Sequence, residues 1–165
     1  MMSAMKIRHE ISYDATPEDV YAMLADPAFR QRSCDAQDVV SCDISIEGRG
    51  QGMTVVIDQV QPVRGVPSFA RKFAGETTRA IQTEEWSSAT EGTLVVTTPG
   101  KPTEIRGRLT LKAEGSSTVE VFEGEVRAKV PLVGGKLESV MAELFRAGMD
   151  KEHDAGIAWL KGEGR

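Results

Sequence analysis

The side chains best suited to acid–base chemistry are a histidine near the N-terminus and a polar run that precedes a tryptophan. His9 lies in an alternating segment, and Gln82 and Glu84 precede Trp86. A general base must reach a substrate proton at hydrogen-bond distance, which an imidazole or a carboxylate can do. We would assign proton transfer to His9 with Glu84, although a histidine satisfied within the core is the simpler interpretation. No residue is assigned as catalytic on this ground alone.

The strand expected at Thr77–Ser87 can be placed in two registers. One register turns Gln82 and Glu84 inward together with Trp86, where they would orient the polar group of a ligand. A shift by one residue turns Ile81 inward instead and leaves both polar side chains in solvent. The sequence alone favours neither register over the other.

Metal and redox chemistry find little support in the sequence. His153 lies in a charged run far from His9, and no two histidines have the spacing of metal ligands. Cys34 and Cys42 lack C-x-x-C spacing, so we expect reduced, unpaired thiols. The sequence also lacks a nucleophile elbow, a phosphate-binding loop and a dinucleotide fingerprint. We therefore predict no metal and no cofactor.

Composition excludes several classes of protein. The chain has 20 Lys and Arg against 25 Asp and Glu, a net charge of −5, which argues against nucleic-acid binding. Its 165 residues, 40% of them hydrophobic, predict one globular domain over residues 1–165. Apolar runs are too short to span a membrane. The start, Met1–Lys6, lacks a secretory signal, so we expect a cytoplasmic protein without integral membrane association.

The spacing of apolar and turn residues predicts the elements that must position these groups. Alternation predicts a strand at Met5–Tyr13. Thr16 and Pro17 begin a helix as cap and first residue, and Asp26-Pro27 begins a second that reaches about Ser33. Short turns then predict an antiparallel meander. Its strands are Val39–Glu47, Met53–Val60, Thr77–Ser87, Gly92–Thr98, Thr103–Ala113 and Thr118–Val130.

A long amphipathic helix and a lid complete the expected structure. Apolar residues recur at steps of three and four from Gly135 to Lys161, which predicts a helix about 40 Å long. A small sheet can cover such a helix only by curling around it. The segment Gln61–Glu76 is rich in proline and glycine and contains Phe69 and Phe73. We interpret it as a mobile loop or a short helical lid over a cavity mouth.

This order of elements resembles the helix-grip fold of the START-like or SRPBCC superfamily, which includes Bet v 1-like, polyketide cyclase-like and lipid-transfer proteins. The resemblance covers essentially the whole chain, and Tyr13–Leu24 resembles the first helix of that superfamily. The segment Val130–Glu138 resembles the start of the final helix in an uncharacterised actinobacterial family within it. The resemblance implies an α+β fold, with a curved antiparallel sheet of about seven strands around the C-terminal helix. It also implies an apolar cavity between them, and no catalytic residue.

The residues that would line this cavity follow from the alternation of the strands and the stripe of the helix. Gly107 and Gly124 on the expected dry face leave space, and methionines adapt to irregular apolar ligands. Leu144 is expected at the centre of the stripe, facing Leu109 and Val126. The expected lining residues are Trp86, Leu109, Leu111, Phe122, Val126, Leu137, Met141, Leu144, Phe145, Phe69 and Phe73, with His9, Gln82 and Glu84 as polar contacts.

Three functions remain open. The first is non-enzymatic binding or transport of a hydrophobic small molecule, such as a lipid or a polyketide-like compound. The second is a small cyclase or dehydratase-like enzyme, in which the cavity positions the substrate and one acid or base, Glu84 or His9, suffices. The third is an interaction module that engages a protein partner through an exposed apolar patch with Phe69 and Phe73. A lid folded over a cavity would favour the first two.

Overall fold

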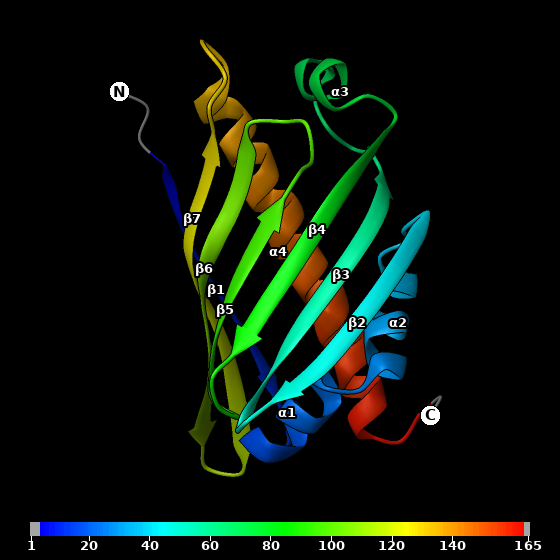
Figure 1. Ribbon diagram of the computed structural model, residues 1–165, viewed down its shortest axis with the longest axis vertical. Coiled ribbons are helices and arrows are strands. Elements are labelled where there is room, and N and C mark those ends of the chain that lie inside the picture. Colours follow the sequence, from blue (N-terminus) through cyan, green and yellow to red (C-terminus); the bar gives the residue numbers. More distant parts are fainter. Residues whose placement is uncertain (1–3, 164–165) are drawn as a thin grey trace.

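The protein, described over residues 4–163 of a computed structural model, is a seven-stranded antiparallel sheet with three short helices and one long helix (Figure 1). The strand order is β1-β7-β6-β5-β4-β3-β2, so every neighbour except β1 and β7 is also consecutive in the chain. The elements are β1 (Met5–Tyr13), α1 (Pro17–Leu24), α2 (Pro27–Ala36), β2 (Ser41–Arg49), β3 (Gly52–Pro62), α3 (Ser68–Ala74), β4 (Thr77–Trp86), β5 (Glu91–Thr97), β6 (Thr103–Glu114), β7 (Ser117–Ala128) and α4 (Gly134–Leu160).

The two helices after β1 begin where the sequence predicts. The Thr16 hydroxyl accepts a hydrogen bond from the Asp19 amide at 3.2 Å, and the Asp26 carboxylate accepts one from the Ala28 amide at 2.9 Å. In both helices a proline occupies the first turn, where its missing N–H costs nothing. The second helix ends at Ala36, three residues beyond the predicted Ser33.

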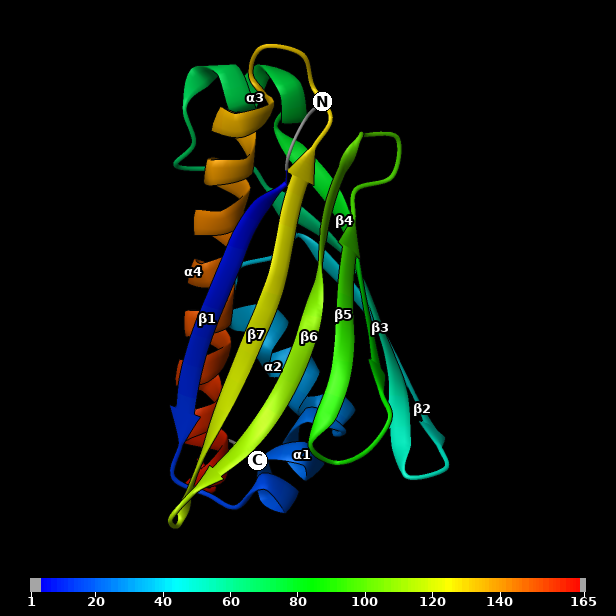
Figure 2. The same cartoon turned by 90° about the vertical axis from the view of Figure 1, so that its left-hand side faces the viewer.

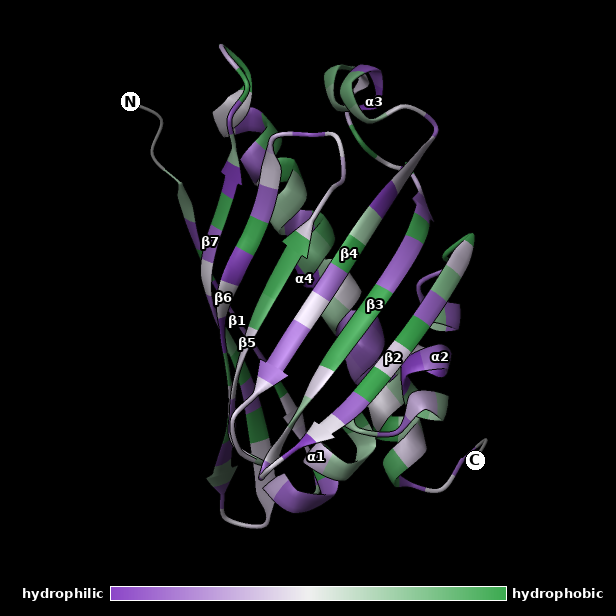
Figure 3. Cartoon of the chain, in the orientation of Figure 1, coloured by the Kyte–Doolittle hydropathy of each residue, from purple (hydrophilic) through white to green (hydrophobic). Residues whose placement is uncertain are grey.

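The long helix α4 runs along one face of the curved sheet (Figure 2). It packs against β1, β7 and α2. Gly156 permits the close approach to β1, because a Cβ atom there would lie 2.6 Å from the Tyr13 ring. Polar and apolar residues alternate along most strands (Figure 3), so one face of the sheet is dry and the other is wet. The predicted α+β helix-grip fold is confirmed.

The segment between β3 and β4 contains α3, so the helical alternative for this lid is the one the protein adopts. Phe69 and Phe73 pack against a small apolar cluster formed by Ala70, Ala128 and Leu137. The cluster joins α3 to the end of β7 and the first turns of α4. Figure 2 shows α3 beside the N-terminal end of α4, at the opposite end of the molecule from α1.

The expectation of unpaired thiols is wrong, because Cys34 in α2 and Cys42 in β2 form a disulfide. The Cα atoms of the two residues are 6.7 Å apart, within the range that a disulfide can bridge. Two cysteines eight residues apart do not form a recognised sequence motif. The pair is brought together by the turn that leads from α2 into the edge strand, which composition alone does not reveal.

The length and hydropathy of a helix decide whether it can span a membrane. None of the helices within residues 4–163 is both long enough and apolar enough to cross a bilayer.

Candidate functional site

A cavity of about 370 Å³ lies between the inner face of the sheet and α4. Its walls come from β3, β4, β5, β6 and Glu120 of β7 on one side and α4 on the other, and residues of the lid segment and of α2 complete the lining. Sites for small molecules in proteins have volumes of about 300–1,000 Å³. The space is therefore large enough for a ligand of modest size.

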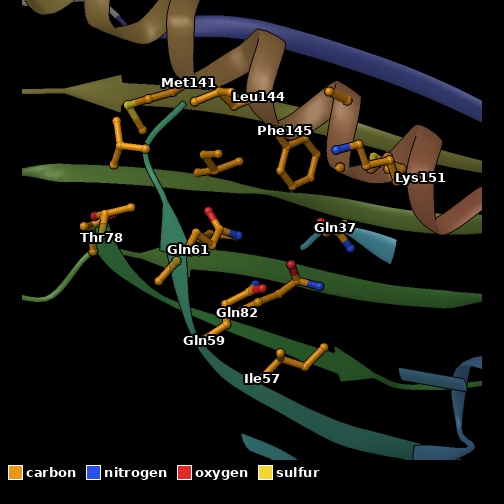
Figure 4. Close-up of a pocket in the computed structure, with 18 of the residues that line it drawn as sticks. Gln37, Ile57, Gln59, Gln61, Thr78, Gln82, Met141, Leu144, Phe145 and Lys151 are labelled. Carbon is orange, nitrogen blue, oxygen red and sulfur yellow. The ribbon is translucent and has the colours of Figure 1, made fainter. Parts of the chain in front are cut away.

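The two walls of the cavity differ in chemistry (Figure 4). Met141, Leu144 and Phe145 present apolar side chains from α4, whereas Gln59 and Gln82 present amides from β3 and β4. A ligand between them would meet apolar side chains on both sides, including Ile57 and Leu109 of the sheet, and hydrogen-bonding amides on the sheet side. Such a combination holds an apolar body while fixing its orientation.

One mouth of the cavity is bordered by exposed residues of α4 and of the end of α2. Gln37 and Asp38 from the α2 end face Leu144 and Lys151 of α4 around it. Leu144 does line the cavity, but 51% of its surface is exposed, so it belongs to the rim and not to the centre of the stripe. Lys151 and Asp38 are exposed as well. Solvent therefore reaches the cavity at this side.

The deep end of the cavity is built on a buried ion pair. Arg30 of α2 donates two hydrogen bonds to the carboxylate of Glu84 in β4, at 2.9 and 2.8 Å. The Arg30 Nε donates a third bond to the Leu24 carbonyl at 2.7 Å. Arg30 and Glu84 are 1% and 3% exposed. The pair survives burial because the guanidinium and the carboxylate satisfy each other in two parallel bonds.

Two further donors hold Glu84 in place. The Trp86 indole N–H donates to it at 2.9 Å and the Gln82 amide at 2.7 Å. Burial raises the pKa of Glu84, but the Arg30 charge and these hydrogen bonds outweigh it and hold the pKa below its ordinary value. Burial lowers the pKa of Arg30, yet the charges of Glu84 and Glu152 raise it overall. Glu84 is thus a fixed carboxylate with little freedom to exchange a proton.

A second carboxyl group at the deep end, that of Glu120, differs from Glu84 in its hydrogen bonding and in its pKa. Glu120 of β7 lines the cavity and is buried, and its Oε1 has no hydrogen-bond partner. Burial, together with the negative charges of Glu152 and Glu84, raises the pKa of Glu120 to about 8. Glu152 of α4 lies 3.7 Å from Arg30 and its pKa is raised chiefly by burial. The cluster therefore holds three carboxyl groups around one guanidinium.

Several residues expected at the cavity do line it. Gln82 and Glu84 point inward, which selects the first of the two registers considered for that strand. Those that line the space are Leu109, Leu137, Met141, Leu144, Phe145, Phe73, Gln82 and Glu84.

Other expected lining residues lie outside it: Trp86, Leu111, Phe122, Val126, Phe69 and His9. Gly107 and Gly124 do not open a void, because a Cβ atom on Gly107 would lie 2.7 Å from the Phe122 ring. Phe122 also packs against Phe145 at a centroid distance of 4.8 Å. Trp86, Leu111 and Val126 are core residues, whereas Phe69 packs within α3 and its cluster.

His9 is not brought to Glu84. Its Nε2 donates instead to the Asp150 carboxylate at 2.7 Å, a contact between β1 and α4. The proposed pairing of His9 with Glu84 for proton transfer therefore has no support in the geometry. A structural histidine, the simpler interpretation of the sequence, agrees with this contact.

Sequence reasoning missed Arg30, Glu120 and Glu152. A signal existed for two of them. Glu120 is two residues from Phe122 and so shares its inward face, and Glu152 continues the helical spacing of Phe145. Glu152 lies in the charged run around His153, which predicts a solvated helix surface, and no role is expected for Glu120 from the sequence. Arg30 gave no comparable signal, because a charged residue in a short polar helix is ordinarily solvated.

Within the described residues, no group of three or more His, Cys, Asp or Glu side chains could hold a metal ion. The site is a partly apolar cavity with a charged deep end.

Fold and site together define a helix-grip fold with a cavity between sheet and C-terminal helix, a fold shared with solved START and Bet v 1-like structures. The chain belongs to the DUF2505 family, described as proteins of unknown function, whose model matches residues 8–160. That this family is actinobacterial stays a prediction from the sequence. No curated protein sequence matches the chain.

Solved structures share the fold at low sequence identity. A START superfamily protein from Mycobacterium smegmatis is 13% identical with a TM-score of 0.64, covering 96% of this chain and 99% of that one. Ara h 8.0201 is 9% identical with a TM-score of 0.62, covering 92% and 97%. Norcoclaurine synthase from Thalictrum flavum, in complex with dopamine and hydroxybenzaldehyde, is 15% identical with a TM-score of 0.59, covering 99% and 90%. Both a START protein and an enzyme thus share this fold.

Proposed function

We propose that the protein binds a hydrophobic small molecule, such as a lipid or a polyketide-like compound, in the cavity between the sheet and α4. The observation that carries this proposal is the cavity itself, with apolar side chains on α4 and a polar deep end. A fully packed core would not leave about 370 Å³ beside Met141 and Phe145. Apolar ligand surface removed from water there contributes roughly 25 cal/mol per Å² to binding, before the costs of association.

The position of the lid supports binding in the cavity over docking of a protein partner. Phe69 and Phe73 pack inward against the apolar cluster at α3, and Phe73 also lines the cavity. An interaction module would have needed these rings on the surface. Cytoplasmic location stays a prediction, and the disulfide counts against it because reducing compartments do not maintain such bonds.

Native mass spectrometry of the purified protein tests the proposal, with titration of the neutral fluorescent probe phenylnaphthylamine alongside it. We expect a co-purified small molecule or saturable probe binding, weakened at least about tenfold in Leu144→Trp. The new indole narrows the mouth, and the fold tolerates it because Leu144 is half exposed.

The matched control is Glu143→Trp, because Glu143 is exposed on α4 and does not line the cavity. It should leave probe affinity unchanged. A wild-type protein that binds neither probe nor copurifying molecule would refute the proposal, as would equal losses in the two variants.

A small enzyme that uses the same cavity is the second candidate. It is favoured by Glu120, a buried carboxyl group at the cavity whose pKa of about 8 suits exchange of a proton near neutral pH. Glu84 is less suited, because four hydrogen bonds from Arg30, Trp86 and Gln82 fix it as a carboxylate. Turnover of a bound compound that is lost in Glu120→Gln would favour the enzyme over the carrier.

A further inference from the structure

The deep end of the cavity has more negative than positive groups. Arg30 donates two hydrogen bonds to Glu84 and one to the Leu24 carbonyl. The charges of Arg30 and Glu84 therefore compensate each other. Glu152 approaches Arg30 only at 3.7 Å, beyond hydrogen-bond distance. Glu120 has an oxygen without any partner. Two carboxyl groups therefore lie at the cavity without a full counter-charge from the protein.

A second, separate side chain in the same cavity also lacks a partner. The amide oxygen of Gln59, on β3, is buried without a hydrogen bond. Gln59 and Glu120 are 7% and 6% exposed, and they come from opposite parts of the sheet. Buried polar atoms are ordinarily paired, because an unpaired one has lost its hydrogen bonds to water without replacement. The Gln59 oxygen is an acceptor, and so is the Glu120 oxygen once that carboxyl group has lost its proton, so a ligand with hydrogen-bond donors would satisfy both.

We propose that the ligand carries a basic amine on its apolar body, and that the ammonium group binds at Glu120 and Glu152 in the deep end of the cavity. This inference rests on the proposed binding function and names the chemical class of its ligand. An ammonium group donates up to three hydrogen bonds and supplies the missing positive charge. The apolar body then extends along Met141 and Phe145 toward the mouth. A carboxylate ligand would instead add a negative charge beside Glu152 and Glu120, and the Arg30 guanidinium is already bonded to Glu84.

Binding of a cation at Glu120 should release a proton. Glu120 is faced by Glu84 from β4, Glu152 from α4, Arg30 from α2 and Tyr13 from β1. Burial and the neighbouring charges of Glu120 and Glu152 raise the pKa of Tyr13, so that phenol stays neutral. With a pKa of about 8, Glu120 is mainly protonated at neutral pH, and an ammonium group would displace that proton. At pH 7 most binding events should therefore release a proton.

Three ligands with one apolar body and different polar groups test the inference: naphthylmethylamine, naphthylmethanol and naphthoic acid. Isothermal titration calorimetry, repeated in two buffers of different ionisation enthalpy, gives both affinity and proton release. At pH 8 we expect the amine to bind wild type at least about tenfold more tightly than the alcohol, and the acid to bind most weakly. The affinity of the amine should rise between about pH 6 and pH 8.

Glu120→Gln should remove the advantage of the amine and the proton release, while binding of the alcohol persists. Glu152→Gln should reduce the same advantage, and Glu125→Gln, on the outward face of β7, should leave it unchanged. Equal affinities for the three ligands, tighter binding of the acid, or an amine preference that persists in Glu120→Gln would overturn the inference. Binding of phenylnaphthylamine distinguishes failure of this inference from failure of the proposed function. If phenylnaphthylamine binds and the amine is not preferred, only the inference about the amine fails. If it does not bind either, the proposed function fails as well.

Discussion

Arg30 of α2 and Glu84 of β4, 54 residues apart in the chain, are joined by two hydrogen bonds of 2.9 and 2.8 Å in the interior of the protein. The pair ties the helix beneath the cavity to the centre of the sheet. Taking both charges out of water costs several kcal/mol, which their mutual attraction must offset. A buried pair of this kind is strongly destabilising when only one partner is removed.

Arg30→Met should therefore lower the free energy of unfolding by about 3–5 kcal/mol, because Glu84 is left as an uncompensated buried charge. Urea unfolding of the variant measures the loss. The double variant Arg30→Met with Glu84→Gln should recover much of it. Arg79→Met is the matched control, because Arg79 also donates two hydrogen bonds to a carboxylate, that of Asp58, but on the surface. The free energy of unfolding should fall only slightly in this control. A loss in Arg30→Met no larger than in the control would show that the buried pair does not stabilise the fold.

The raised pKa of Glu120 predicts a stability that falls as pH rises. The folded protein holds a proton on Glu120 up to about pH 8, whereas an ordinary glutamate in the unfolded chain ionises near 4.5. The stabilising effect is complete below the unfolded value and is lost progressively as pH rises through the folded one. Glu120→Gln should flatten this fall between about pH 5 and pH 8 and be more stable than wild type at pH 8.

Urea unfolding at several pH values measures this dependence, with Glu125→Gln as the exposed control on the same strand. The control should follow wild type. A Glu120→Gln variant that shows the same fall in stability as wild type would mean that another group titrates in this range.

The fold could be predicted from the sequence because its signals are local and repeated. The caps at Thr16 and Asp26 begin two helices, and alternation from Thr103 to Ala128 defines an inner and an outer face. The disulfide could not be predicted, since it depends on how α2 turns into β2. The pairing of Cys34 with Cys42 is a tertiary contact without a sequence motif.

Reduction of the Cys34–Cys42 disulfide should destabilise the protein. The bond closes a loop of only eight residues, and loops of this size restrict the unfolded chain by about 2–3 kcal/mol. A thermal melt with and without reductant should show a lower melting temperature in the reduced protein. Cys42→Ser should melt near the reduced wild type and be insensitive to reductant. Identical melts of oxidised and reduced protein, with thiol titration confirming both states, would contradict this expectation.

The lid should be less protected from hydrogen exchange than the centre of the sheet. Amides of α3 belong to a seven-residue helix without a side-chain cap, whereas those of β6 are bonded on both sides by β5 and β7. Hydrogen exchange measured by mass spectrometry should show faster exchange over residues 61–76 than over 103–114, with slowing when a ligand binds. Protection of the lid equal to that of β6 would place it in the stable core.

The cavity was only partly predictable for a related reason. Alternation along β6 places Leu109 on the inner face, whereas along β4 it leaves two registers and places Gln82 and Glu84 inward in only one of them. Alternation also does not show which inward side chains contact one another and which face open space. Phe122 has the right parity but fills the room above Gly107. Arg30 reaches Glu84 only through the placement of α2 under the sheet, a contact between segments 54 residues apart.

The most direct test of ligand binding in the cavity is an NMR titration of the protein with methionine methyl groups labelled with carbon-13. Met141 and Met149 line the cavity, whereas Met23 and Met53 are buried elsewhere in the core. On addition of phenylnaphthylamine we expect saturable shifts of the Met141 and Met149 methyl resonances, with those of Met23 and Met53 nearly unchanged. Absence of any saturable shift, or equal shifts of all four methyl groups, would contradict binding between the sheet and α4.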